Sequence, residues 1–317
     1  MDDKETGLVM KSTGSLYLVR TRDDRIVACR LRGKFRMQDI KITNPIAVGD
    51  NVLFIQDNNH QGHGIITDIK ERKNYICRKS INLSKISHLI AANVDCVFLV
   101  ISLREPRTPL GFIDRFLVAT ESFRIKTILL FNKTDLYDAQ TQKNHLYLQN
   151  IYSHIGYECL STSVVTKEGM DKLTLKMQNN ISLFGGQSGV GKSSIINVLD
   201  PNLQLKIGNI SDYNSKGKHT TTFAEMFELS FGGFIIDTPG IKEFGLIKYK
   251  KEEISHYFPE MLRLLPACKF NNCTHTHEPS CRVKQALEKG EIAPSRYQNY
   301  LDIIQNEDIN LKEWMME

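Results

Sequence analysis

The chain has 317 residues, of which 41% are hydrophobic and 24% are charged, and its formal net charge is +5. This length and apolar content predict a globular protein of two or three domains. The longest apolar run, at residues 94–103, is too short for a membrane span, and residues 1–5 lack a signal-peptide pattern, so we expect a cytoplasmic protein with no membrane partner. Seven cysteines, an odd number, imply no disulfide framework.

Residues 7–69 contain short alternating or β-branched runs separated by turn signals, which predicts a small antiparallel barrel such as an OB-fold. The five runs are Gly7–Met10, Ser15–Arg20, Arg25–Arg32, Asn51–Ile55 and Gly64–Ile69. Residues 1–80 hold 15 Lys and Arg against 10 Asp and Glu, so the basic surplus lies in this part of the chain. Such barrels often bind single-stranded nucleic acid; the alternative is a basic surface that only promotes solubility.

From residue 95 onward, predicted strands and helices alternate as in a doubly wound α/β sheet. The predicted strands cover residues 95–102, 126–131, 157–161 and 181–184, and the helices residues 109–123, 139–154, 167–178 and 193–199. A hairpin is predicted from residues 221–230 and 233–237, and the polar segment 211–218 before it is predicted to be a mobile loop.

Asn132-Lys133-Thr134-Asp135 follows one of these strands, at the sheet edge where ligands of such folds bind. The Asp135 carboxylate can accept two hydrogen bonds from the ring N–H and the amino group of guanine, which adenine does not offer, so the motif favours GTP over ATP. A surface turn is the alternative for four residues alone. The next strand ends at Ser161-Thr162-Ser163, where we expect backbone groups of Ser161 and Thr162 to contact the base.

Residues 186–194 fit the P-loop pattern G-x-x-x-x-G-K-[ST] between a predicted strand and a predicted helix. Backbone N–H groups surround the phosphates, Lys192 neutralises the outer phosphates and Ser193 can ligate magnesium. The expected phosphate-binding residues are Gly186, Gln187, Ser188, Gly189, Val190, Gly191, Lys192, Ser193 and Ser194.

Asp237-Thr238-Pro239-Gly240 follows the strand 234–236, which indicates a switch in which Asp237 holds magnesium through water and the Gly240 amide senses the γ-phosphate. Thr221 is the favoured threonine of residues 220–222 for completing the magnesium shell. Ile241 stands where Ras-like enzymes carry a water-orienting glutamine, so a polar group must be brought in. His219 is our candidate to orient or deprotonate water; the alternative is that it contacts only RNA or solvent.

Two further patterns concern the order of the motifs and the C-terminal cysteines. The guanine motif precedes the P-loop, whereas an ordinary GTPase has the opposite order, so the domain is predicted to be circularly permuted. Cys268, Cys273, His275 and Cys281 give C-x4-C-x-H-x5-C, a ligand set that suits one tetrahedral zinc ion per chain. His277 is the rival histidine ligand, and cysteines packed as small hydrophobes are the alternative to a metal site.

With these motifs in this order, the sequence resembles the ribosome small-subunit-dependent GTPase A family, the circularly permuted GTPases of bacterial ribosome assembly. The resemblance covers the whole chain, including residues 217–222, residues 237–246 and the cysteine cluster. It implies GTP hydrolysis stimulated by the small ribosomal subunit, a role in late maturation of that subunit, rRNA contacts from the flanking domains, and His275 rather than His277 as the zinc ligand.

We therefore predict an OB-like RNA-binding barrel at residues 1–75, a circularly permuted α/β P-loop GTPase domain at 76–245 and a helical zinc-binding domain at 246–317. The expected reaction is magnesium-dependent hydrolysis of GTP to GDP and phosphate by a monomer, with the small ribosomal subunit and its rRNA as partners. The rivals are an RNA-binding zinc protein that does not turn nucleotide over, and a P-loop ATPase or kinase. Nucleotide preference and turnover separate these classes.

Overall fold

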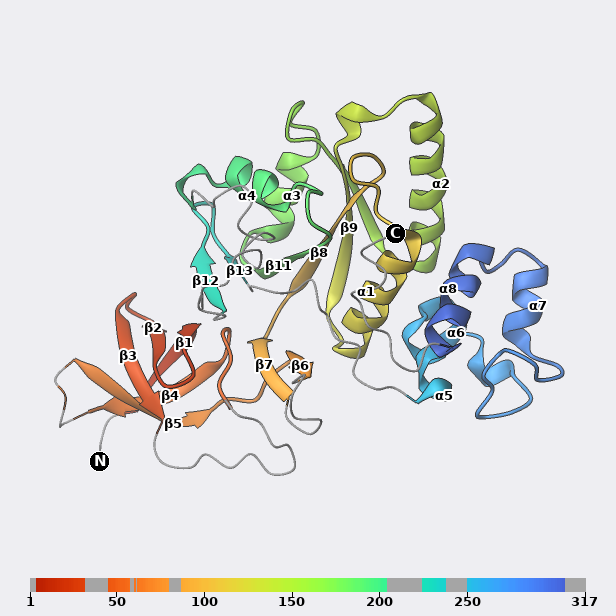
Figure 1. Ribbon diagram of the computed structural model, residues 1–317. Coiled ribbons are helices and arrows are strands. Elements are labelled where there is room, and N and C mark those ends of the chain that lie inside the picture. Colours follow the sequence, from red (N-terminus) through yellow and green to blue (C-terminus); the bar gives the residue numbers. More distant parts are fainter. Residues whose placement is uncertain are drawn as a thin grey trace, which may run out of the picture. The chain divides into compact units, whose positions relative to one another are not determined.

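The computed structural model describes residues 4–31, 45–57, 60, 62–79, 87–203, 224–237 and 250–305. The chain forms two compact units, Met1–Phe98 with Met170–Lys242 and Leu99–Gly169 with Glu243–Glu317 (Figure 1). The boundary at residues 98 and 99 falls within strand β8 (Cys96–Ser102). Within the described ranges, every helix is too short or too polar to cross a lipid bilayer.

The elements alternate much as predicted from the sequence after residue 95. The other strands are β1 (Glu5–Ser12), β2 (Tyr17–Thr21), β3 (Ile26–Leu31), β4 (Asn51–Gln56), β5 (His63–Ile69), β6 (Tyr75–Lys79), β7 (Ser87–Ala92), β9 (Lys126–Asn132), β10 (Glu158–Thr162), β11 (Ile181–Gly185), β12 (Glu225–Glu228) and β13 (Phe234–Asp237). The helices are α1 (Leu110–Ser122), α2 (Ala139–Ile155), α3 (Met170–Met177), α4 (Lys192–Leu199), α5 (Lys251–Ile254), α6 (Pro259–Leu262), α7 (Arg282–Glu288) and α8 (Pro294–Gln305), with short 3-10 turns η1 (Thr134–Leu136), η2 (Pro201–Leu203), η4 (Ser255–Tyr257) and η5 (Leu265–Ala267).

Strands β1 to β5 form the predicted N-terminal barrel. β1 pairs with both β2 and β4, and β3 pairs with β5, so the sheet closes on itself. The β3–β5 pair is parallel, so the barrel is not antiparallel throughout, in contrast to the prediction from the sequence. Alternate residues of the strands point inward and, together with Ile46 from the segment before β4, form the core, whose strand residues are Val9, Tyr17, Val19, Cys29, Val52, Phe54 and Ile66. A Cβ on Gly64 would come within 2.7 Å of the Cys29 sulfur and 2.9 Å of the Phe54 ring, so this strand position requires glycine.

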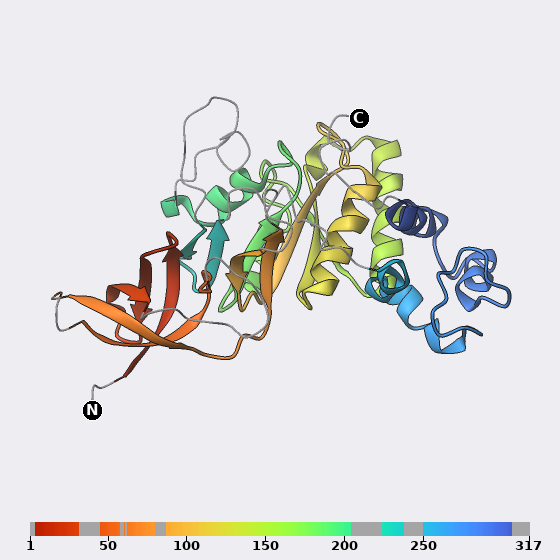
Figure 2. The same cartoon turned by 60° about the horizontal axis from the view of Figure 1, so that its bottom comes forward.

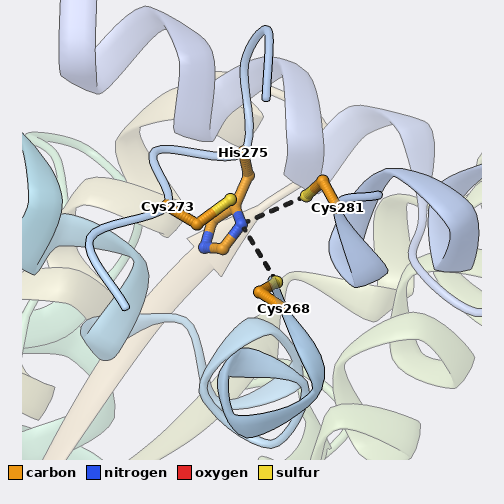
Figure 3. Close-up of side chains that lie close together, drawn as sticks. All are labelled: Cys268, Cys273, His275 and Cys281. Carbon is orange, nitrogen blue, oxygen red and sulfur yellow. Dashed lines mark hydrogen bonds between the residues drawn. The ribbon is translucent and has the colours of Figure 1, made fainter. Parts of the chain in front are cut away.

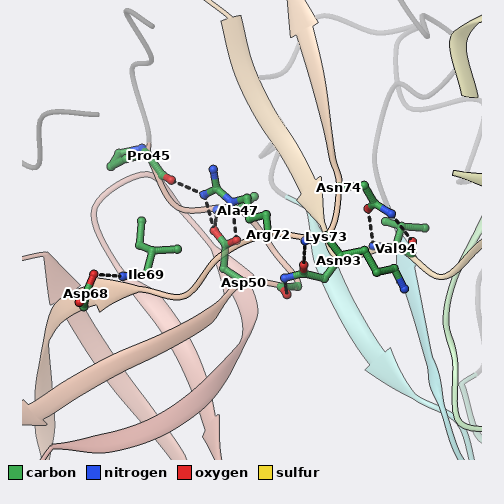
Figure 4. Close-up of polar contacts among 11 residues, drawn as sticks. Pro45, Ala47, Asp50, Asp68, Ile69, Arg72, Lys73, Asn74, Asn93 and Val94 are labelled. Atoms are coloured by element: carbon green, nitrogen blue, oxygen red, sulfur yellow. Dashed lines mark hydrogen bonds and ion pairs between the residues drawn. The ribbon is translucent and has the colours of Figure 1, made fainter. Parts of the chain in front are cut away.

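After β5 the chain leaves the barrel through residues 71–74, and side chains of this segment form hydrogen bonds with the residues around Asp50 and with Val94 (Figure 4). Arg72 donates to both carboxylate oxygens of the buried Asp50, at 2.6 Å each, and to the Pro45 carbonyl at 2.6 Å. Asn74 exchanges two hydrogen bonds with the backbone of Val94, at 2.8 and 2.9 Å. Asp50 is fully buried, and Arg72 contacts both of its carboxylate oxygens. This charged pair therefore holds the segment after β5 against the loop before β4.

The hairpin of β6 and β7 follows this segment and was not predicted from the sequence. The two strands pair antiparallel from Tyr75↔Ala92 to Lys79↔Ser87, and Val48 makes an isolated bridge to Ala91. Its backbone is therefore held by the barrel loop before β4 as well as by its own ladder.

In the first unit, the sheet continues from the barrel into the strands that carry nucleotide motifs. The order is β11-β13-β12-β1, in which β11 and β13 are parallel while β12 pairs antiparallel with both β13 and β1. β12 and β13 are the predicted hairpin, with its turn closed by the amide of Leu229 donating to the Gly233 carbonyl.

In the second unit, β10, β9 and β8 form the sheet, and helices of the C-terminal region pack on α1. Helix α8 contacts α1, and Figure 2 shows the C-terminal helices, in blue, on the side of α1 and α2. The C-terminal core contains Val118 of α1 together with Ile254, Phe258, Met261, Val283, Ala286 and Tyr300. The core of the C-terminal helices therefore includes a residue of α1.

A buried ion pair lies in the same packing region. Arg296 of α8 donates to Asp114 of α1 at 2.6 Å and makes two hydrogen bonds to Glu260, at 2.7 and 3.1 Å. Asp114 also accepts from Tyr152 of α2 at 2.8 Å and from Asn299 at 2.5 Å. The side chains of Arg296 and Asp114 are each 1% exposed, so this network is removed from water.

We expect Arg296→Met to lower the free energy of unfolding by about 3 to 5 kcal/mol, because the buried Asp114 and the partly buried Glu260 lose their cation. The matched control is Arg282→Met, whose pair with Glu291 is 28% and 47% exposed and should contribute about 1 kcal/mol or less. Urea unfolding followed by circular dichroism measures both. Equal losses in the two variants would contradict the assigned importance of the Arg296 network.

Candidate functional site

The P-loop connects β11 to α4 in the first unit, as the sequence predicts. Gly186, Gly189 and Gly191 have φ values of 135°, 76° and 101°, a conformation that side-chain-bearing residues seldom adopt. Lys192 opens α4, and its ammonium donates to the carbonyl oxygens of Gly186 at 2.8 Å and Gln187 at 2.6 Å. The lysine therefore bends back over the loop whose amides would cradle phosphate.

Two oxygen ligands of the predicted magnesium site lie on adjacent parts of this unit. Asp237 is the last residue of β13, which pairs in parallel with β11, and Ser193 lies in the first turn of α4. Burial, with a smaller contribution from the charge of Glu225, raises the pKa of Asp237 above its ordinary value. A hydroxyl and a carboxylate are ligands that magnesium prefers, and a cation offsets the cost of a partly buried carboxylate, so these residues fit the ion.

The guanine motif lies in the second unit at the end of β9. Asn132 is buried, and its side-chain oxygen accepts from Thr162 Oγ1 at 3.1 Å. Lys133 has a left-handed backbone with φ 63°, and its ammonium donates to the carbonyl of Glu105. Ser161 does not contact this motif through its hydroxyl, which lies 3.3 Å from the ring Nε2 of His145. Thr162 thus orients Asn132, while Ser161 packs against α2.

Ser163 positions the Asp135 carboxylate, a role that the sequence motifs do not assign. Its hydroxyl donates to Asp135 Oδ1 at 2.5 Å and accepts from the amides of Val165 and Thr166, at 3.2 and 3.1 Å. The Asp135 side chain is otherwise exposed and ready to accept hydrogen bonds. The sequence signal for this role is the position of Ser163, which directly follows β10, the strand that pairs with β9.

The loop after Ser163 folds back toward the guanine motif. The Glu168 carboxylate accepts from Thr134 Oγ1 at 2.5 Å, a contact that the sequence motifs also do not indicate. The loop closes at Gly169, where φ is +74° and a Cβ would come within 2.1 Å of the Ser161 carbonyl oxygen. Only glycine fits there, so the backbone of this loop is defined.

The four metal-ligand candidates of the C-terminal region converge in the second unit. One ligand atom from each of Cys268, Cys273, His275 and Cys281 lies within 4.8 Å of the others. His275 points its Nδ1 at the sulfur atoms of Cys268 and Cys281, at 3.8 and 3.3 Å (Figure 3). The rival His277 is exposed and lies outside this group. Three sulfurs and one imidazole at this spacing fit a tetrahedral zinc ion.

The loop around His275 is held by tyrosines of α8 and by Glu278. Tyr297 and Tyr300 donate to the carbonyls of His275 and Thr274, at 2.7 and 2.5 Å. Although burial alone would raise it, hydrogen bonds from Thr274 lower the pKa of Glu278 to about 2. Burial also raises the pKa of the Cys273 thiol to about 12, which a bound cation would reverse by stabilising the thiolate.

Several predicted site residues lie outside the described residues. They are His219, Thr221 and Gly240, together with Ile241 and the segment 211–218. Their roles stay predictions.

Comparisons with known proteins agree with this arrangement. Residues 69–247 match the family model described as RsgA GTPase, and residues 6–66 match the RsgA N-terminal domain. A relative from Flavobacterium psychrophilum, a small ribosomal subunit biogenesis GTPase RsgA, is 52% identical over 96% of this chain and 93% of its own length. The relative of the same name from Phocaeicola vulgatus is 47% identical over 95% of this chain and 97% of its own length.

Two solved structures share the fold. The crystal structure of YjeQ from Thermotoga maritima has a TM-score of 0.77 at 34% identity, covering 96% of this chain and 99% of that one. The crystal structure of YloQ, described as a circularly permuted GTPase, has a TM-score of 0.74 at 30% identity, with 96% and 95% covered.

Proposed function

The chain belongs to the RsgA family of circularly permuted GTPases, and from this premise we propose that it hydrolyses GTP in the biogenesis of the small ribosomal subunit. The observation that carries the choice of GTP is the exposed Asp135 carboxylate with one oxygen fixed by Ser163, since a fixed acceptor pair matches the two donors of guanine. The domain limits that we propose are residues 1–75, 76–245 and 246–317. Its place of action is the cytoplasm, where it works as a monomer.

We propose that residues 186–194 bind the phosphates of GTP and that Ser193, Asp237 and Thr221 hold the accompanying magnesium. Magnesium neutralises charge that develops on the β- and γ-phosphate oxygens during transfer. When GTP binds, the Lys192 ammonium donates to phosphate oxygens in place of the carbonyl oxygens of Gly186 and Gln187. The Gly240 amide senses whether the γ-phosphate is present.

The finer partner assignment is contact with rRNA during late maturation of the small subunit. The barrel supports it by its basic surplus, in which the Arg22 and Arg30 side chains are exposed. In the C-terminal region, Phe270 is 38% exposed between two zinc ligands, and the Lys269 ammonium lies 5.5 Å from its ring centroid. An exposed aromatic ring beside a cation suits a nucleobase and its phosphate.

We propose that His219 supplies the polar group that Ile241 lacks, and that the small subunit brings it into position. The free protein should hydrolyse GTP slowly, and purified small subunits should raise the rate by about tenfold or more. His219→Ala should bind GTP and small subunits normally and lose most of the stimulated rate.

The control for this experiment is Lys192→Ala, which should abolish turnover with and without subunits. A fully retained stimulated rate in His219→Ala would assign water activation to the partner. Absence of any hydrolysis by the parent protein on added subunits would overturn the enzymatic proposal in favour of a nucleotide-regulated RNA-binding protein, and equal use of ATP would point to an ATPase.

A further inference from the structure

A row of three charged residues crosses neighbouring strands of the first unit. Lys11 of β1 is the register partner of Glu225 of β12, and Glu225 is the register partner of Asp237 of β13. Directly opposite residues of antiparallel strands project from the same face of the sheet, with Cβ atoms about 4.5 to 5.5 Å apart. The row therefore carries one positive charge from the barrel, then two carboxylates, the second of which is the proposed magnesium ligand.

The two ends of the row affect Glu225 in opposite ways. Lys11 Nζ lies 2.7 Å from Glu225 Oε2, and the two side chains are 34% and 36% exposed. Like charges directly opposite each other destabilise a strand pair, so Glu225 and Asp237 tolerate each other only with compensation. Lys11 supplies it on one side of Glu225. A cation bound at Asp237 would supply it on the other.

A second ion pair joins the barrel to β12 without entering this row. Arg20 of β2 lies 3.0 Å from Glu228, the register partner of Phe234 at the far end of β13. Because successive residues of a strand alternate between faces, Glu228 projects from the opposite face to Glu225. The two pairs thus join the same parts of the chain by the same chemistry, but only the first lies beside Asp237.

We propose that Glu225 is a positioning residue that tunes the affinity of Asp237 for magnesium, and that Lys11 of the barrel sets how strongly it does so. This inference rests on the proposed role of Asp237 as a magnesium ligand. Glu225 adds negative charge near the cation and strengthens its binding, whereas Lys11 cancels part of that charge. A side chain of the barrel thereby contributes to the electrostatic environment of the nucleotide-associated cation.

The test measures the magnesium concentration that half-saturates the GDP complex, read from the dissociation rate of a fluorescent GDP analogue. Glu225→Gln should raise this concentration by about three- to tenfold, and Lys11→Gln should lower it by a similar factor. The double variant should return to within about twofold of the parent, because the two charge changes cancel. Both shifts should shrink as potassium chloride is added.

Opposite signs separate electrostatic tuning from a structural role, since loss of a stabilising contact would move both single variants in the same direction. Arg20→Gln and Glu228→Gln are the matched controls and should change the magnesium dependence by less than about twofold. Asp237→Asn tests the premise and should raise the magnesium requirement by more than about tenfold. An unchanged requirement there would overturn the magnesium assignment itself. The magnesium requirement could instead rise in Asp237→Asn while the Lys11 and Glu225 variants shift it in the same direction or not at all. That result would overturn only the tuning proposal.

Discussion

Asp135→Asn is expected to weaken GTP binding about a hundredfold and to improve the binding of xanthosine triphosphate. Each hydrogen bond to a charged acceptor contributes about 1.5 to 3 kcal/mol, and guanine makes two to this carboxylate in the proposed complex. Xanthine replaces the amino group by a carbonyl, so an asparagine that donates through Nδ2 and accepts through Oδ1 matches it. Titration with fluorescent guanosine and xanthosine diphosphates measures the exchange of preference.

The control variant is Ser163→Ala, which removes the hydroxyl 2.5 Å from Asp135 Oδ1 but keeps the carboxylate. It should weaken guanine nucleotide binding by about tenfold, because the carboxylate is less well oriented, and should not improve xanthine binding. If Asp135→Asn left the nucleotide preference unchanged, the guanine assignment would be wrong. A gain of xanthine binding in Ser163→Ala would contradict the positioning role of Ser163.

The second large effect concerns the metal cluster. Cys273→Ser is expected to reduce the zinc content from one ion per chain to near zero and to unfold the region around the cluster, because metal binding contributes folding free energy directly. Elemental analysis gives the zinc content, and limited proteolysis reports the loss of structure at residues 268–281. Chelation of the parent protein should reproduce both results.

Two controls define the ligand set. Cys159→Ser alters a half-buried thiol of the same unit that lies outside the cluster, and it should keep the full zinc content. His277→Ala should also keep it, whereas His275→Ala should not. Full zinc content in Cys273→Ser would refute the cluster as the metal site, and loss in His277→Ala would reassign the fourth ligand.

Much of the fold could be predicted because local patterns and tertiary structure agree. The runs before Asn132 and Gly186 are apolar and bounded by polar motifs, and β9 and β11 formed there. The hairpin of β6 and β7 was missed because its strands are held by contacts distant in sequence, such as the bridge from Val48 to Ala91. Residues 71–74 are polar, as in a linker. Nothing in their local sequence indicates that Arg72 forms an ion pair with the buried Asp50.

The sequence predicts those site residues that lie together in short motifs. It does not predict contacts that depend on which strands pair and in what register. The Cys and His spacing alone indicates the metal cluster, and the four side chains do converge. The contact of Ser163 with Asp135 requires β9 and β10 to be neighbours, and the row of Lys11, Glu225 and Asp237 requires the register of three strands. A sequence does not reveal such registers, because each depends on turns and packing elsewhere.

Asp114 is synthesised 182 residues before its partner Arg296. At about 5 to 20 residues per second, a growing chain holds α1 for roughly 10 to 40 s before α8 is made. Until α8 is made, the face of α1 that carries Asp114 and Val118 lacks the helix that covers it in the finished fold, and a carboxylate on that face reduces its apolar area. Once this face is covered, the buried carboxylate destabilises any packing that offers it no hydrogen-bond donor. In the finished fold, Arg296 and Asn299 of α8 bring the donors that this carboxylate requires, so the segment that is made last satisfies a polar group that is made early.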